Sequence, residues 1–278
     1  MKTAKRLLRN FAFTSGLILT VGLIVVALAA PLIAPTDPFQ QDTSRRLEAP
    51  SNDHPLGLDD LGRDVLSRVV WGARVSLRVG FSVVIIASLV GVTLGAIAGY
   101  FGGILDLLVM RLCDILLAFP GILLAIALVA VLGPSLNNVV LALATIGWVG
   151  YARLVRGQVL KVREMEYVTA ARALGARSPR VIIRHVLPNV INPVIVMATL
   201  GLAGAILSEA ALSFLGLGVQ PPTPSWGAML TAGRRYLGLA NHLAVFPGAA
   251  IMLAVMGLNF LGDGLIDALD PKYRKQLS

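Results

Sequence analysis

The sequence predicts an all-α membrane protein with six membrane-spanning helices. Of its 278 residues, 56% are hydrophobic and only 14% are charged, whereas soluble domains carry about a quarter charged residues. The apolar residues are concentrated in runs, several of which reach the roughly 20 residues that a helix needs to cross a bilayer. The basic residues cluster between these runs, so orientation in lipid explains the net charge of +9 better than nucleic-acid binding does.

Six apolar segments are candidates for spans. A basic stretch precedes the first, but this run is too long for a signal peptide, so we expect it to be retained. Pro120 and Gly121 predict a kink in the third. The spans are expected at residues 13–34, 79–101, 107–132, 139–154, 190–212 and 243–261.

The basic residues also predict the orientation. With the N-terminus in the cytoplasm, 16 of the 24 Lys and Arg residues fall on the cytoplasmic side, as the positive-inside rule requires. The chain then divides into a cytoplasmic N-terminus with the first span (1–34), an extracytoplasmic loop (35–78), a five-helix membrane core (79–266) with a cytoplasmic loop at 161–188, and a cytoplasmic C-terminal tail (267–278).

The second half of the extracytoplasmic loop predicts an amphipathic helix. Val65, Leu66, Val69, Val70 and Ala73 would share one face of this helix. The helix could lie flat at the membrane interface or offer a docking surface to an outside partner.

The cytoplasmic loop predicts a helical hairpin. Residues 162–174 are rich in helix formers, and Gly175 suits the position after a helix end. Ser178 and Pro179 would begin a second helix, which would end at Pro188. An apolar stripe is expected on the first helix at Val162, Met165, Val168, Ala171 and Leu174. Anionic lipid, the protein's own bundle and a soluble partner are equally open as targets of this hairpin.

Part of this hairpin resembles a known family motif. Ala170 and Ala171, then Gly175, then Leu187 and Pro188 are similar to the Glu-Ala-Ala loop of the membrane subunits of binding-protein-dependent ABC importers. In that family the loop is the coupling helix, which docks on the cytoplasmic ATPase. The resemblance implies the same role for these five residues.

The motif also departs from the family pattern at two positions. Thr169 stands where the family has glutamate, and His185 stands where it has isoleucine. Glu166, one turn before Thr169 on the same helix face, is a candidate replacement for the missing carboxylate.

Other stretches narrow the resemblance to one class of these importers. QPPTPSWG and GDGLIDALDP, in this order after the loop, look like the C-type permease of the dipeptide, oligopeptide and nickel class. This implies a second homologous permease subunit, two ATPase subunits, an extracytoplasmic solute-binding protein and an inner-membrane location. The expected cargo is di- or oligopeptides. Nickel or another small solute is the alternative, and an ion-gradient-driven secondary transporter is a third hypothesis.

The sequence predicts no cofactor and no enzymatic activity for this chain itself. It contains no G-x-x-x-x-G-K-[ST] motif, so ATP and Mg²⁺ are expected on the ATPase subunits. His54, His185 and His242 lie far apart, and the single cysteine, Cys113, falls in an apolar run, so no metal site is expected.

Three glycines of the second span predict close helix packing. Gly91, Gly95 and Gly99 lie on one helix face, and the packing could be between subunits or within the chain.

Glu209 and Asp114 fall within or at the ends of spans, where a bare charge is costly. Glu209 is a candidate for the translocation pathway, with a water-exposed or arginine-paired carboxylate as the alternative. Asp114 is expected to pair with Arg111, one turn away. Asp263 and Asp267 are expected at the cytoplasmic interface.

Overall fold

The computed structural model describes residues 10–269, and within this range the protein is a bundle of α-helices without any β-strand. The helices are α2 (Phe11–Leu28), α3 (Ala30–Ile33), α4 (Val65–Phe101), α5 (Gly103–Leu117), α6 (Gly121–Leu132), α7 (Leu136–Val162), α8 (Glu166–Ala173), α9 (Ser178–Val181), α10 (Leu187–Phe214), α11 (Trp226–Gly233) and α12 (His242–Leu269). This confirms the predicted all-α class. Most of the predicted C-terminal tail and of the basic N-terminal stretch lies outside the described residues.

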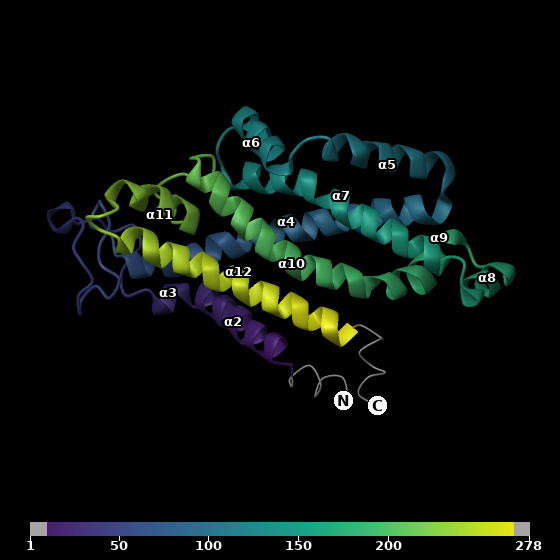
Figure 1. Ribbon diagram of the computed structural model, residues 1–278, viewed down its shortest axis with the longest axis horizontal. Helices are drawn as coiled ribbons and strands as arrows, with labels where there is room; N and C mark the ends of the chain where they lie inside the picture. Colours follow the sequence, from purple (N-terminus) through teal and green to yellow (C-terminus); the bar gives the residue numbers. More distant parts are fainter. Residues whose placement is uncertain (1–9, 270–278) are drawn as a thin grey trace.

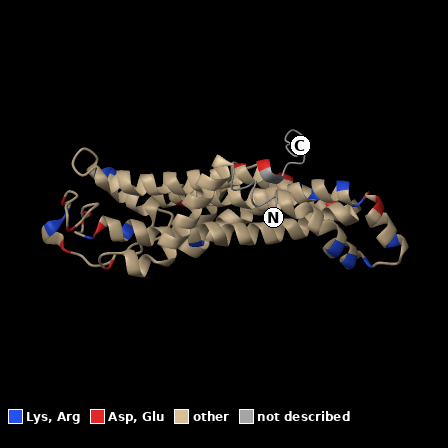
Figure 2. Cartoon of the chain, turned by 90° about the horizontal axis from the view of Figure 1, so that it is seen from below, with Lys and Arg blue, Asp and Glu red and all other residues tan. Residues whose placement is uncertain are grey.

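The bundle is elongated, with its long helices side by side. α2, α4, α7, α10 and α12 run along the long axis, while α8 and α9 lie at one end and α11 lies near the opposite end (Figure 1). Charged residues gather mainly near the two ends, and the middle is almost free of them (Figure 2). This distribution is typical of a bundle that crosses a bilayer.

Within residues 10–269, five helices are long and apolar enough to cross a membrane, and α5 with α6 brings the number to six if this bent pair is one span. The expected kink is a sharp break, because α5 and α6 meet at 86°. Pro120 precedes the first residue of α6, and its missing N–H prevents α5 from continuing through this position.

The separate amphipathic helix expected in the outer loop is not found. Val65 begins α4, which continues without a break to Phe101 over 37 residues. The carboxylate of Asp64 caps this helix by accepting a hydrogen bond from the Ser67 backbone N–H at 2.7 Å. Val65 and Val70 are buried inside the protein, so this face meets other helices and not the membrane surface. At about 1.5 Å per residue α4 is about 55 Å long, well beyond the hydrocarbon core.

The second hairpin helix does not end at Pro188. A π-helical turn at Ile182–Val186 joins α9 to α10, with the Leu187 N–H bonded to the Ile182 carbonyl oxygen. Pro188 lies in the first turn of α10, where its missing N–H removes no hydrogen bond of that helix. The hairpin therefore continues directly into the fifth span.

The predicted glycine face lies against α7 within the chain. A Cβ atom at Gly91 would lie 2.5 Å from the Trp148 carbonyl oxygen, and one at Gly95 would lie 2.4 Å from the Ala152 carbonyl oxygen. Gly99 faces Val159 in the same way, at 2.9 Å from its Cβ. Since two of these neighbours are backbone atoms, α4 and α7 approach too closely for any side chain.

The first and last spans form a second close pair. The Asn10 side chain donates from Nδ2 to Asp267 Oδ2 at 3.0 Å, and a Cβ at Gly16 would meet the backbone N of Leu261 at 2.3 Å. The start of α2 and the end of α12 therefore lie together, and Asp263 is exposed nearby on α12.

Candidate functional site

The predicted hairpin is present at one end of the bundle. α8 ends in a Schellman motif, in which the Ala176 N–H bonds to the Ala171 carbonyl at 3.1 Å and the Gly175 N–H bonds to the Arg172 carbonyl at 2.9 Å. This turn needs a left-handed residue, and Gly175 supplies it with a φ of 83°. α9 then begins at Ser178, with Pro179 in its first turn.

Three valines anchor the hairpin to the bundle. Val168, Val181 and Val186 are fully buried in the same apolar core as the end of α7. The expected five-residue stripe is only partly found, because Met165 and Leu174 are exposed. Residues 163–165 form a turn between α7 and α8, and this turn breaks the helical repeat on which the stripe was based.

The outer surface of the hairpin is exposed, basic and tipped by an apolar residue. Glu166, Thr169, Ala170, Gly175 and Pro188 are exposed, while Ala171 and Leu187 are half-buried. Leu174 is 88% exposed at the tip. Four arginines of the hairpin, Arg172, Arg177, Arg180 and Arg184, are exposed as well, and basic residues gather at one end of the bundle (Figure 2).

The structure does not place Glu209 as a water-exposed or arginine-paired carboxylate, which was the alternative to a role in the translocation pathway. Its side chain is fully buried, and it is bonded to serine hydroxyls and not to an arginine. Ser213 Oγ donates to Glu209 Oε1 at 2.6 Å, and Ser76 Oγ donates to Oε2 at 3.5 Å. Ser76 lies on α4, so this carboxylate links two spans.

A large groove lies beside Glu209. It has a volume of about 970 Å³ and runs between α4, α6, α7 and α10, with a mostly apolar lining. Ser208, Tyr151 and Asn192 are among its few polar residues, and Glu209 does not line it. The sequence did not predict this groove, because its lining depends on how helices from several parts of the chain pack together.

The ion pairs of α5 also differ from expectation. Asp114 pairs with Arg153 of α7 and not with Arg111. Nearer the start of α5, Asp106 pairs with Arg156 of the same helix α7, with Arg156 Nη2 donating to Asp106 Oδ2 at 2.7 Å. The antiparallel packing of α5 along α7 brings these partners together (Figure 1), which local spacing cannot reveal.

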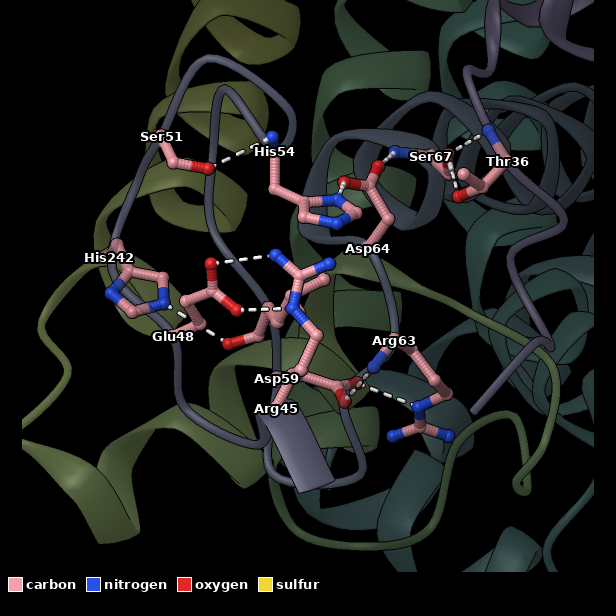
Figure 3. Close-up of polar contacts among 11 residues, drawn as sticks. Thr36, Arg45, Glu48, Ser51, His54, Asp59, Arg63, Asp64, Ser67 and His242 are labelled. Atoms are coloured by element: carbon pink, nitrogen blue, oxygen red, sulfur yellow. Dashed lines mark hydrogen bonds and ion pairs between the residues drawn. The ribbon is translucent and has the colours of Figure 1, made fainter. Parts of the chain in front are cut away.

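The opposite end of the bundle carries a polar cluster built on the loop before α4 (Figure 3). His54 Nδ1 lies 3.0 Å from Asp64 Oδ1, Arg63 Nε donates to Asp59 Oδ2 at 2.7 Å, and His242 Nε2 lies 3.2 Å from the Leu58 carbonyl oxygen. These bonds fold the loop against α4 and the start of α12.

Arg45 and Glu48 close the same loop with two hydrogen bonds of 2.7 Å. The hydrogen bonds from Arg45 hold the pKa of Glu48 below its ordinary value, and Glu48 in turn raises the pKa of Arg45. Over residues 10–269, no group of three or more His, Cys, Asp and Glu residues is placed to hold a metal ion.

The comparison with known proteins identifies the family. Residues 91–275 match the family described as the inner membrane component of binding-protein-dependent transport systems, and residues 2–50 match the N-terminal transmembrane domain of oligopeptide transport permease C. The chain belongs to this permease family. The predicted resemblance to the C-type permeases is thereby confirmed, and the permease is a multipass protein of the inner membrane.

Individual relatives match the permease over nearly its whole length. It is 49% identical to the dipeptide transport system permease protein of Alkalihalophilus pseudofirmus, over 97% of this chain and 89% of the relative. It is 44% identical to the glutathione transport system permease protein of Pectobacterium atrosepticum, over 97% and 90%. The glutathione permease of an Escherichia coli strain is 46% identical, over 96% and 88%.

Proposed function

We propose that this permease is one of two homologous membrane subunits of an ATP-driven importer for short peptides. The main support for a subunit that couples to an ATPase is the basic hairpin. It is anchored by buried valines and presents Leu174 and four arginines to the solvent. The names of the relatives support the cargo, since dipeptides and glutathione are both short peptides.

In this proposal the hairpin docks on a cytoplasmic ATPase subunit. Two such subunits bind ATP and Mg²⁺ and hydrolyse the nucleotide, and this chain contributes no nucleotide site. Ala170, Ala171 and Gly175 shape the docking helix and its turn. Glu166 and Thr169 are both exposed on the first half of α8, which leaves Glu166 free to supply the carboxylate that the family has at the position of Thr169.

The opposite end of the bundle receives an extracytoplasmic binding protein. The start of α2 and the end of α12 are the ends of these two helices that point toward the hairpin (Figure 1), which supports cytoplasmic N- and C-termini. The apolar groove beside α10 forms this chain's share of the translocation pathway. Because its lining is mostly apolar, the groove would bind no single peptide side chain strongly, so peptides of varied sequence could pass.

The docking proposal is tested by a charge at the hairpin tip. The permease is expressed with its second permease subunit and its ATPase subunits, and Leu174→Asp is compared with Leu237→Asp. Leu237 is 63% exposed at the opposite end and receives the same chemical change. We expect Leu174→Asp to reduce ATPase co-purification while membrane insertion stays normal, and Leu237→Asp to leave co-purification unchanged. Equal ATPase recovery in both variants would contradict the proposal.

The turn at Gly175 gives a second test with its own control. Gly175→Val places a β-branched residue at a positive φ, whereas asparagine tolerates this conformation. Stimulation of ATP hydrolysis by loaded binding protein should fall in Gly175→Val and persist in Gly175→Asn. Uptake assays with labelled dipeptide, glutathione and nickel then test the cargo.

A further inference from the structure

The turn between α4 and α5 lies against the base of the hairpin. α4 ends at Phe101, and Gly102 and Gly103 follow with positive φ values of 66° and 58°. These two residues reverse the chain, so that α4 and α5 meet at their cytoplasmic ends (Figure 1).

Two arginines join α8 to this end of α4. Arg163, in the turn before α8, donates from Nη1 to the Gly99 carbonyl oxygen at 2.8 Å. Arg172, on α8 itself, places its guanidinium over the ring of Tyr100, with Cζ at 4.8 Å from the ring centroid. We call these four residues the α8 brace.

The two arginines of the brace contact a backbone carbonyl and an aromatic ring at the end of α4. The Gly99 carbonyl belongs to the last turn of α4, where carbonyl groups lack helical N–H partners. The Tyr100 ring offers an electron-rich face, which attracts a guanidinium. The other exposed arginines of the hairpin, Arg177, Arg180 and Arg184, make no ion pair or ring contact within the described part of the chain. The positive-inside rule accounts for the charge of all these arginines, but not for the two contacts of the brace.

The brace lies at the short turn that connects α7 to α8. The covalent connection of α8 to α7 is the short turn at residues 163–165, and Val168 is the one residue of α8 buried in the core that the end of α7 shares. α7 and α4, by contrast, are packed backbone to backbone at Gly91 and Gly95. A contact from α8 to the end of α4 therefore fixes α8 to this rigid pair.

A third arginine extends the connection to α5. Arg156 lies on α7 seven residues, or about two helical turns, before Arg163, which follows the last residue of that helix. Its guanidinium binds both carboxylate oxygens of Asp106, in the first turn of α5. Displacement of α7 is thus passed to the third span as well.

We propose that Arg163 and Arg172 are positioning residues, which make α8 move as one body with α4 and α7 when the ATPase displaces the hairpin. The inference rests on the docking role proposed above. It adds a route to the second and third spans that does not depend on the covalent connections of the hairpin to the fourth and fifth.

The ring of Tyr100 provides a matched pair of variants. Tyr100→Phe keeps the aromatic face and Tyr100→Leu removes it. We expect both to co-purify with the ATPase, and binding-protein-stimulated hydrolysis to fall about two- to fivefold in Tyr100→Leu alone, the size of one cation–π contact at a partly exposed site. Equal stimulated rates in the two variants would overturn the brace.

A double-mutant cycle separates a shared contact from two independent effects. Arg172→Ala should lower the stimulated rate as much as Tyr100→Leu, and the double variant should lose no more than either single one. If the fold-decrease in the stimulated rate of the double variant equalled the product of the two single decreases, the two residues would act independently and not through a common contact. If the unaltered complex shows no stimulation, the proposed function itself fails. If that complex is stimulated and Tyr100→Leu is equally stimulated, only the brace fails.

Cross-linking tests whether the two helices move together. In a Cys113→Ala background, Tyr100→Cys with Arg172→Cys removes the cation–π contact of the brace, and a short bis-methanethiosulfonate replaces this contact with a covalent link. We expect the link to restore the stimulated rate of hydrolysis, and reductant to lower it again by about the same two- to fivefold. Hydrolysis that stops on cross-linking and returns with reductant would show that α8 must move against α4, which would overturn the proposal.

Discussion

Glu209 and Ser213 lie one turn apart on α10, and the Ser213 hydroxyl donates to the Glu209 carboxylate at 2.6 Å in a site closed to solvent. The loop after α10 seals this site, because a Cβ at Gly218 would lie 1.7 Å from Ser213 Oγ. The carboxylate also accepts from Ser76 on α4. This geometry favours a role in holding α4, α10 and the loop after α10 together.

Glu209→Gln is therefore expected to leave peptide uptake close to that of the unaltered permease, since the amide oxygen still accepts a hydrogen bond from Ser213. Glu209→Leu removes the acceptor and leaves buried hydroxyls unpaired, at a cost of about 1–3 kcal/mol. Thermal unfolding of the purified complex measures this loss. A large fall in uptake by a normally folded Glu209→Gln variant would instead place this residue in the translocation pathway.

The packing of α4 on α7 predicts a strong effect at Gly95. Gly95→Ala introduces a Cβ at 2.4 Å from the Ala152 carbonyl oxygen, so the helices must separate, which costs about 1–3 kcal/mol. Gly22→Ala is the matched control, because no atom lies within 4 Å of its added Cβ, and alanine favours the helix by up to about 1 kcal/mol. The melting temperature should fall in the first variant only. Equal melting temperatures would show that α4 and α7 are not tightly packed.

The loop before α4 predicts a dependence of its stability on acid pH. The hydrogen bonds from Arg45 lower the pKa of Glu48 from its ordinary value of 4.5. Because the folded-state pKa is depressed, this pair contributes stability above pH 4.5, and the contribution is lost as pH falls through the lower, folded-state value. Exposure of the pair keeps the effect small. Protection of residues 42–64 against hydrogen exchange, relative to the intrinsic rate at each pH, should therefore fall below pH 4.5.

Glu48→Gln serves as the control for this pH dependence. Comparing the two proteins at each pH cancels the intrinsic effect of pH on exchange. The unaltered loop should exchange more slowly than the variant near neutral pH and approach it as the pH falls. A constant difference across the whole range would contradict the assignment.

The sequence predicted the parts of this structure that depend on local pattern. The hairpin was predictable because Gly175, Ser178 and Pro179 each favour one backbone conformation, and the spans were predictable from apolar runs. The continuation of the span helix back to Val65 was missed, because its first turns alternate apolar and charged residues as a surface helix would. The burial of Glu209 and the groove beside it depend on contacts between distant segments, which local spacing does not encode.

The partner of Asp114 also could not be predicted from local spacing, and this ion pair gives the last prediction. Its partner is Arg153 on α7, and the two side chains are 54% and 46% exposed, so they face the surroundings of the bundle. An unpaired charge at a lipid-facing position costs about 2.5–3.5 kcal/mol near the bilayer centre and less toward its edge. Arg153→Asp should therefore lower the yield of inserted permease, and the swap of Asp114→Arg with Arg153→Asp should restore it.

Arg111 provides the control, because it was the expected partner and is exposed on the same helix. Arg111→Asp combined with Asp114→Arg preserves the charges at local spacing but introduces a second guanidinium opposite Arg153. This variant should insert poorly, since two guanidinium groups would then face each other across α5 and α7. If the Arg111 swap restored the yield of inserted permease and the Arg153 swap did not, Asp114 would pair with Arg111. That result would contradict the packing of α5 on α7.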